Sequence, residues 1–232
     1  MKKIIAIIPA RGGSKRLPRK NVLPLGGIPL LARVIRTVKD SGVFEKIVVS
    51  SEDTEILALA QKEAAVAHAR PLELASDRST VVETCINVLE SYPSDSFCCI
   101  YATAALISKE TLKSSSKIFL SDGSVNVLMG VSKYNYHPAQ ALRVLDDGTA
   151  NLLFPDFQHI QSQFYPDVRV SNGTFYWAKT NNFLEEKTFY STRLRLFDVP
   201  CAEVCDIDTE SDFLRLTEIF NSNCREKNDF QD

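Results

Sequence analysis

Short apolar runs alternate with amphipathic helical patterns along most of this chain, and this alternation constrains the fold more than any other feature of the sequence. The first run, residues 3–8, precedes a pattern of apolar residues at helical spacing, and KIVVSS and FCCIYATA repeat this order further along. Strands that alternate with helices in this way form a mostly parallel sheet covered by helices. The sequence therefore predicts an α/β fold with three layers, α/β/α.

Start and stop residues mark the ends of several elements. In IPLLARVIRTVKDSG, Pro29 stands where a helix begins and Gly42 where it ends. Further helices are predicted over DTEILALAQKEA, VVETCINVLESY, residues 109–120 and ESDFLRLTEIFNSN, and further strands over residues 126–131 and LRLFDVP.

Residues 132–200 depart from this pattern, because they are turn-rich and their aromatic residues are clustered. The aromatic residues in question are Tyr134, Tyr136, Phe154, Phe157, Phe164, Tyr165, Phe175, Tyr176 and Trp177. We expect a single domain over residues 1–232, in which 132–200 form an excursion that serves as a dimerisation surface or a substrate lid. A small aromatic core inside the domain is the alternative.

Charge and apolar content exclude several classes of protein. The 232 residues carry 27 Lys plus Arg against 29 Asp plus Glu, so a general polyanion binder is not indicated. No apolar run approaches the roughly 18–20 residues of a membrane span, and the N-terminal run is too short for a signal-peptide core. The six cysteines include no C-x-x-C pair and are expected as free thiols, although Cys201 and Cys205 leave a metal role open. These features predict a cytoplasmic protein.

A basic loop follows the first apolar run. Its cations are Arg11, Lys15, Arg16, Arg19 and Lys20. Ligands of open parallel sheets bind at the carboxyl ends of the strands, and this loop lies at such an end. Glycines at positions 12 and 13 would let backbone N–H groups approach an anion, and the cations would neutralise phosphate charge. The loop has neither the three-glycine dinucleotide spacing nor the ending of a P-loop. It therefore predicts a polyphosphate site of another kind, with a solvated basic loop as the alternative.

A pair of carboxylates near the C-terminus, in VCDIDTESDF, gives a second signal. Asp206 and Asp208 are two residues apart, so in an extended segment their side chains point the same way and can share a hard cation. Thr209 and Asp212 have the spacing of a helix cap, so decoration of a helix N-terminus is the alternative. Together with the basic loop, the pair predicts Mg²⁺ carrying a nucleoside triphosphate.

Three segments, IPARGGSKRLPRKN, RPLELASDRST and DIDTESDF, resemble the signature segments of the cytidylyltransferases that activate nonulosonic acids, the acylneuraminate (CMP-sialic acid synthetase) family. They occur in the family's order and spacing over nearly the whole chain. The segment KRLPRKN, which ends at Asn21, resembles this family more than the related 3-deoxy-manno-octulosonate cytidylyltransferases, whose sequence continues with Lys-Pro at this point. CCIYATA followed by FYWAK is most similar to the pseudaminic acid branch, since sialic acid enzymes carry a Gln-Pro-Thr-Ser-Pro type sequence at residues 101–105.

The resemblance implies a Rossmann-like nucleotidyltransferase fold and transfer of CMP from CTP to a nonulosonic sugar acid, with release of pyrophosphate. It also implies Mg²⁺ as cofactor and a homodimer, with no nucleic acid or membrane partner. The residues that it places at the nucleotide are Arg11, Gly12, Ser14, Lys15, Arg16, Lys20, Asn21, Arg70, Ser76 and Ser79. At the sugar it places Asp77, Thr80, Tyr101, Thr103, Gln161 and Phe175. Lys20, Arg11 and Asp208 would be catalytic, and Asp206 and Asp208 would bind the metal.

The sugar half of the pattern departs from the family. Gln161 stands where an arginine is expected, and residues 170–174 differ from the His-Asp-Ala-Gly-Gln of the pseudaminic branch. An arginine would clamp the sugar carboxylate with two hydrogen bonds, and Arg169 is a nearby replacement. No residue of the sequence is singled out as a general base.

Three other functions stay open on the sequence. A nucleotidyltransferase for another sugar acid or a small alcohol would share the basic loop and the carboxylate pair. A sugar-nucleotide-binding homologue without catalysis would keep the fold and tolerate a change such as that at Gln161. A structural or nucleic-acid-binding module is disfavoured, because the chain is slightly acidic and its cations are confined to one loop.

Overall fold

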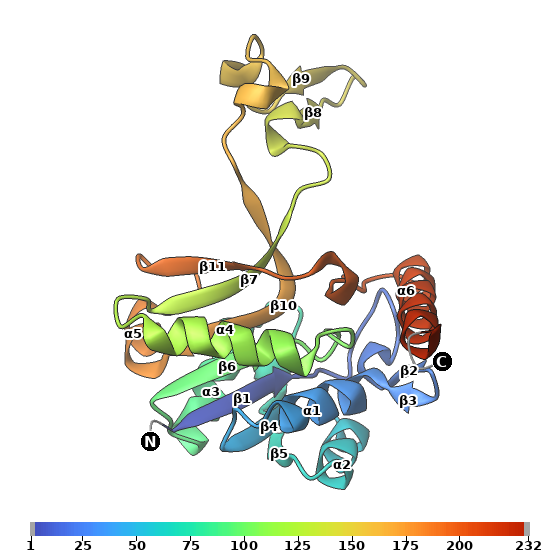
Figure 1. Cartoon of the computed structure of the whole chain (residues 1–232), viewed down its shortest axis with the longest axis vertical. Coiled ribbons are helices and arrows are strands. Elements are labelled where there is room, and N and C mark those ends of the chain that lie inside the picture. The colour runs from blue at the N-terminus through green and yellow to red at the C-terminus, as the bar shows by residue number, and fades with distance from the viewer. Residues whose placement is uncertain (1–2, 230–232) are drawn as a thin grey trace.

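In the computed structural model, which describes residues 3–229 and the side chains as far as Asn223, a mixed sheet forms the centre of the molecule (Figure 1). Its strand order is β11-β7-β10-β6-β1-β4-β5. The strands are β1 (Ile4–Pro9), β4 (Lys46–Ser51), β5 (Val66–Ala69), β6 (Ser96–Ile100), β7 (Val127–Lys133), β10 (Arg169–Lys179) and β11 (Leu194–Asp198). All pairings are parallel except those of β10, which is antiparallel to both of its neighbours.

Helices cover both faces of this sheet, which confirms the predicted three-layer fold. On one face lie α1 (Leu30–Ser41), α2 (Thr54–Lys62) and α4 (Lys109–Ser121). On the other face lie α3 (Val81–Ser91) and α5 (Thr180–Glu186). The strand β1 separates two cores, because its alternate side chains point to opposite faces: Ile4, Ala6 and Ile8 to the first, Ile5 and Ile7 to the second.

The last helix, α6 (Glu210–Asp229), packs beside the carboxyl end of β1 rather than on a sheet face (Figure 1). Leu216 of α6 and Ile207 just before it are fully buried against Leu17, Leu25 and Leu30. Leu25 belongs to a small ribbon of β2 (Pro24–Leu25) and β3 (Ile28–Pro29). This third core ties the acidic segment before α6 to the loop that follows β1.

The ends of the helices agree with the start and stop residues of the sequence. Pro29 directly precedes α1, and Gly42 ends it in the left-handed conformation with φ of 64°. Asp53 caps α2 by accepting hydrogen bonds from the backbone N–H groups of residues 55 and 56. Thr80 and Glu83 form a complete capping box at the start of α3.

The excursion is shorter than the predicted 132–200. The chain leaves the sheet only after β7 and returns to it at β10, so the projecting arm comprises residues 134–168 (Figure 1). At its tip β8 (Leu142–Val144) pairs with β9 (Ala150–Leu152) in a two-stranded ribbon. Phe175, Tyr176 and Trp177, which the sequence predicts in the excursion, are instead buried in β10 in the middle of the sheet.

A bulge explains why the pattern of β10 is hard to recognise. Between Ser171 and Tyr176 the pairing of β10 with β7 changes register, and Gly173 adopts φ of 65°. The Asn172 carboxamide accepts hydrogen bonds from the backbone N–H and the hydroxyl of Thr174 and donates to Ser132 Oγ. Asn-Gly is a turn signal in the sequence, but here it marks a bulge inside a central strand.

Candidate nucleotide-binding site

Several polar segments meet at one edge of the sheet because the parallel strands end there. The basic loop follows β1, Glu52 and Asp53 follow β4, Arg70 follows β5, and Tyr101 follows β6. This is the edge at which open α/β sheets bind their ligands. The acidic segment before α6 reaches the same edge, since Lys20 of the basic loop donates a hydrogen bond to the carbonyl oxygen of Ile207.

A cavity of ≈ 300 Å³, the central cavity, opens between these segments. The predicted nucleotide-binding residues that line it are Arg11, Lys20, Asn21, Arg70, Ser76 and Ser79. The predicted sugar-binding residues that line it are Asp77, Thr80, Tyr101 and Thr103. Pro9, Leu74, Val81, Thr84 and Ala102, which the sequence patterns did not single out, complete the wall. Residues that are far apart in the sequence are thus brought together as expected.

A second cavity of ≈ 250 Å³, the basic cavity, adjoins the first. Ser14, Lys15, Arg16 and Asp208 line only the basic cavity. Arg11, Lys20, Asn21 and Asp77 line both cavities. A ligand with a triphosphate at one end and an uncharged ring at the other can therefore place the triphosphate in the basic cavity and the ring in the central cavity.

Two aspartates neutralise the cations of the basic cavity. Asp77 accepts from Arg11 Nη1 at 2.9 Å and from Lys15 Nζ at 2.5 Å. Asp208 Oδ1 lies 2.8 Å from Arg16 Nη2 and 3.3 Å from Lys20 Nζ. The hydrogen bond and charge of Lys15, with those of Arg11, hold the pKa of Asp77 below its ordinary value. Four cations thus face two carboxylates, which leaves an excess of positive charge for a polyanionic ligand.

The base of the basic loop is fixed by buried hydrogen bonds. Lys20 and Asn21 begin the short 3-10 turn η1 (Lys20–Val22). The Asn21 carboxamide is buried and donates to the carbonyl oxygen of Arg11 at 2.8 Å. The side chain of Lys20 is only 19% exposed, whereas that of Lys15 is 79% exposed. Lys20 is therefore a partly buried, positioned charge, whereas Lys15 is a charge at the surface.

Two members of the basic loop do not face a ligand as predicted. The backbone N–H of Gly12 donates to Glu52 Oε1 at 2.8 Å, so it is already engaged and cannot hold an anion. A Cβ atom at position 12 would lie 2.4 Å from Asp53 Oδ2, which explains why glycine is needed there. Arg19 binds Asp53 and Glu55 at the start of α2 and lines neither cavity.

Besides Gly12, three predicted residues lie outside both cavities. Phe175 is fully buried in the core, where its ring packs near Phe197, so contact with a sugar is excluded in this arrangement. Gln161 belongs to the arm and lines neither cavity of its own chain. Asp206 is exposed and contributes to neither wall.

Arg169 does not take the place of the arginine expected at position 161. Its guanidinium binds Asp167 and, at 2.7 Å through Nε, Asp198. The hydrogen bonds that Arg169 donates to these two carboxylates raise the pKa of its guanidinium. The residue lines neither cavity, so it stabilises the base of the arm instead.

Metal binding within one chain would depend on Asp208. Among the described residues, no three histidine, cysteine, aspartate or glutamate side chains are grouped so that they could hold a metal ion. Asp208 lines the basic cavity beside the cations, and Mg²⁺ commonly takes one or two carboxylates and completes its shell with phosphate oxygens and water. The carboxylate of Asp208 fits this arrangement, whereas that of Asp206 would have to turn toward the cavity.

The lining side chains offer no obvious proton acceptor. None of the lining residues that the structure describes is a histidine, and their carboxylates are the ion-paired Asp77 and Asp208. Burial raises the pKa of Tyr101, which therefore stays protonated near neutral pH and can donate a hydrogen bond. The site is built to hold charge rather than to abstract a proton.

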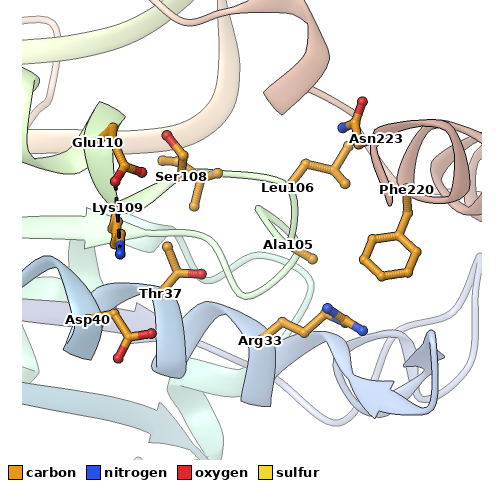
Figure 2. A pocket seen from close by; sticks show the side chains of 11 residues that line it. Arg33, Thr37, Asp40, Ala105, Leu106, Ser108, Lys109, Glu110, Phe220 and Asn223 are labelled. Carbon is orange, nitrogen blue, oxygen red and sulfur yellow. Dashed lines mark ion pairs between the residues drawn. The ribbon is translucent and has the colours of Figure 1, made fainter. Parts of the chain in front are cut away.

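A further cavity of ≈ 330 Å³ lies between α1, residues 105–110 and α6 (Figure 2). Arg33 extends along its floor, with its guanidinium carbon 4.3 Å from the centre of the Phe220 ring. None of the predicted site residues lines this cavity. Size alone therefore does not identify the functional site, and we assign it to the central and basic cavities.

Known families and proteins give the same indication as the geometry. A family described as "Cytidylyltransferase" matches residues 5–225. A pseudaminic acid cytidylyltransferase of Campylobacter jejuni is 35% identical over 218 residues, 90% of this chain and 93% of the relative. A CMP-N,N'-diacetyllegionaminic acid synthase of Legionella pneumophila is 33% identical over 220 residues, 91% of this chain and 93% of the relative.

Solved structures support the fold. A CMP:2-keto-3-deoxy-manno-octonic acid synthetase complexed with CTP matches with a TM-score of 0.70 at 14% identity, covering 95% of this chain and 99% of the other. The 4-diphosphocytidyl-2C-methyl-D-erythritol synthase of Anaerococcus prevotii matches with a TM-score of 0.66 at 13% identity, with the same coverage. Over the part of the chain that the structure describes, no helix combines the length and apolar character needed to cross a membrane.

Proposed function

The chain belongs to the cytidylyltransferase family, and we propose that it transfers CMP from CTP to the anomeric hydroxyl of a nonulosonic sugar acid of the pseudaminic type and releases pyrophosphate. One observation carries this proposal: the basic cavity and the central cavity share a wall of Arg11, Lys20, Asn21 and Asp77. Two relatives named pseudaminic acid cytidylyltransferase, at 35% and 36% identity, support the choice of acceptor.

In the proposed complex, the triphosphate lies in the basic cavity and the nucleoside and sugar lie in the central cavity. Binding exchanges the carboxylates of Asp77 and Asp208 for phosphate oxygens as partners of the cations. Lys20 and Arg11 lie in the shared wall, where the bond between the α- and β-phosphates would be broken. Their positive charges would stabilise the charge that develops as the sugar oxygen attacks the α-phosphorus and pyrophosphate departs.

Asp208, released from Arg16 and Lys20, is the carboxylate that we propose for Mg²⁺ binding, with Asp206 as a second ligand after reorientation. When bound, Mg²⁺ supplies neutralisation of the triphosphate. The protein's part is to present Asp208 at the edge of the basic cavity, through the burial of Ile207 and the contact of its carbonyl oxygen with Lys20.

We also propose that the protein is a homodimer in which the arm of one subunit covers the central cavity of the other. The arm carries large apolar side chains in contact with solvent, including Tyr136 at 86% exposure and Phe164 at 71%. Such exposure on a projecting segment indicates an interface. Gln161 would then border the sugar in the partner's cavity, which accounts for its distance from the site of its own chain.

Pyrophosphate release with CTP, Mg²⁺ and a panel of acceptors tests the proposal. The panel is pseudaminic acid, legionaminic acid, N-acetylneuraminic acid and 3-deoxy-manno-octulosonic acid, with ATP, GTP and UTP as control nucleotides. Turnover that requires CTP and is fastest with one nonulosonic acid is the expected result. CTP binding without turnover on any acceptor would contradict the proposal and favour a non-catalytic sugar-nucleotide-binding protein.

A further inference from the structure

Glu52 is a buried carboxylate behind the site that no sequence motif singled out. It follows β4, its side chain is 13% exposed, and it lines neither the central nor the basic cavity. Oε1 accepts from the backbone N–H of Gly12 at 2.8 Å, and Oε2 accepts from Arg70 Nη2 at 2.8 Å. One carboxylate thus contacts both the basic loop and a residue of the central cavity.

Arg70 depends on Glu52 for its place in the cavity wall. The arginine side chain is 4% exposed, and a guanidinium buried to this degree requires a partner charge. Nη2 is held by Glu52 and Nη1 donates to Thr84 Oγ1 on α3 at 3.0 Å, while the buried Nε has no hydrogen-bond partner. The guanidinium is therefore fixed from two sides.

The charge of Glu52 is maintained by the same contacts. Burial by itself would raise its pKa, but the hydrogen bonds from Arg70 and from the backbone N–H of Gly12 bring the pKa below the ordinary value. Glu52 is thus ionised near neutral pH, as both of its hydrogen bonds require. Loss of that charge would leave Arg70 buried without a counter-ion.

We propose that Glu52 is a positioning residue for nucleotide binding. It holds Arg70 against the central cavity and, through Gly12, fixes the basic loop relative to β4. Arg70 and the basic loop thereby keep a fixed position relative to each other, so that both parts of the site are ordered before the nucleotide binds. This inference rests on the proposed use of the two cavities for CTP.

Glu52→Gln separates the two contacts of the carboxylate. The amide oxygen of glutamine still accepts from Gly12, but its NH₂ group faces a donor of Arg70 and cannot accept from it. Because a hydrogen bond to a charged group is lost, we expect the dissociation constant and the KM for CTP to rise about tenfold or more. The acceptor KM should stay within about twofold, since the sugar would not contact Arg70.

Glu63→Gln is the matched control. Glu63 is 11% exposed at its side chain and binds Arg36 through Nη2 at 2.6 Å and Nε at 2.8 Å, outside both cavities. Glu63→Gln should lower the thermal stability no more than Glu52→Gln does, because Arg36 is half exposed, and it should leave CTP binding unchanged. Equal CTP binding by the two variants would overturn the inference.

A double variant shows whether Glu52 acts through Arg70. If it does, Glu52→Gln should weaken CTP binding no further in an Arg70→Met background, and full additivity would contradict the proposal.

Should Glu52→Gln not fold, Thr84→Val removes the other contact of Arg70 and should weaken CTP binding about threefold or more. Unchanged CTP binding by this variant would contradict the proposal as well. Failure of the unmodified protein to bind CTP in calorimetry would instead refute the proposed function itself.

Discussion

Lys20 offers the sharpest test of how the nucleotide is held. Its ammonium contacts the carbonyl oxygen of Ile207 and lies 3.3 Å from Asp208 Oδ1, at the wall that the two cavities share. Lys20→Met keeps the length of the side chain and removes the charge. Lys15→Met is the comparison, because Lys15 belongs to the same loop and lines the same basic cavity but is far more exposed.

The size of the effect follows from burial and from the partners in the free protein. A hydrogen bond to a charged group contributes about 1.5–3 kcal/mol, and about 1.4 kcal/mol corresponds to a factor of ten. Lys20 already has Asp208 as a partner, so binding exchanges one anion for another and the lower half of that range applies. We expect a rise of roughly 10- to 40-fold in the CTP dissociation constant. Lys15→Met should change it by at most about fivefold, because exposed ion pairs contribute little.

Initial rates of pyrophosphate release, with CTP varied at saturating acceptor and then the reverse, give both KM values, and calorimetry gives CTP binding directly. For Lys20→Met we expect the KM and the dissociation constant for CTP to rise while the acceptor KM stays unchanged. If the acceptor KM rises instead, the shared wall holds the sugar and our orientation of the nucleotide is wrong. If both lysine variants behave alike, burial does not decide the contribution of these charges.

Four further outcomes are expected. Asp208→Asn should lower Mg²⁺-dependent turnover at least about 100-fold at saturating Mg²⁺ with unchanged thermal stability, and undiminished turnover would exclude this residue from the metal site. Gly12→Ala should cost about 1–3 kcal/mol in urea unfolding, because its methyl group overlaps Asp53; no loss of stability would mean that the loop relaxes freely. Phe164→Asp on the arm should shift the sedimentation coefficient from dimer to monomer, and a monomeric unmodified protein would contradict the proposed interface. Hydrogen bonds from Arg70 and Gly12 hold the pKa of Glu52 in the folded protein below its ordinary value of 4.5, so its ionised form stabilises the fold above that pH and the contribution is lost on acidification. The difference in unfolding free energy between the unmodified protein and Glu52→Gln should therefore shrink as the pH falls below 4.5, and a constant difference would mean that the charge of Glu52 does not matter.

The cavity-lining residues of the basic loop were predictable because a cation-rich loop after a buried strand has few other uses. Lys15, Arg16 and Lys20 lie at the basic cavity as expected. Arg19 does not lie there, because it forms ion pairs with Asp53 and Glu55 at the start of α2 instead. No pattern in the sequence indicates which of several neighbouring cations is engaged by a distant element, since that depends on tertiary packing.

Other parts of the structure could not be predicted from the local sequence. β10 contains Asn172 and Gly173, which favour a turn, and only the pairing with β6 and β7 makes the segment a strand. Glu52 is a single glutamate after a strand, and nothing in its neighbours shows that it contacts Arg70. Phe175 matches an aromatic motif, but its side chain faces the core because side chains alternate along a strand.

The place of β10 in the sheet has a consequence for how the chain is made. β10 lies between β6 and β7, yet residues 101–168 must be synthesised after β6 before β10 appears. At roughly 5–20 residues per second, several seconds pass in which the fully buried residues of β6 form an unpaired edge. The arm is therefore completed while the nascent sheet is still open, and slower elongation in this region would prolong the interval in which two nascent chains can join by their β6 edges.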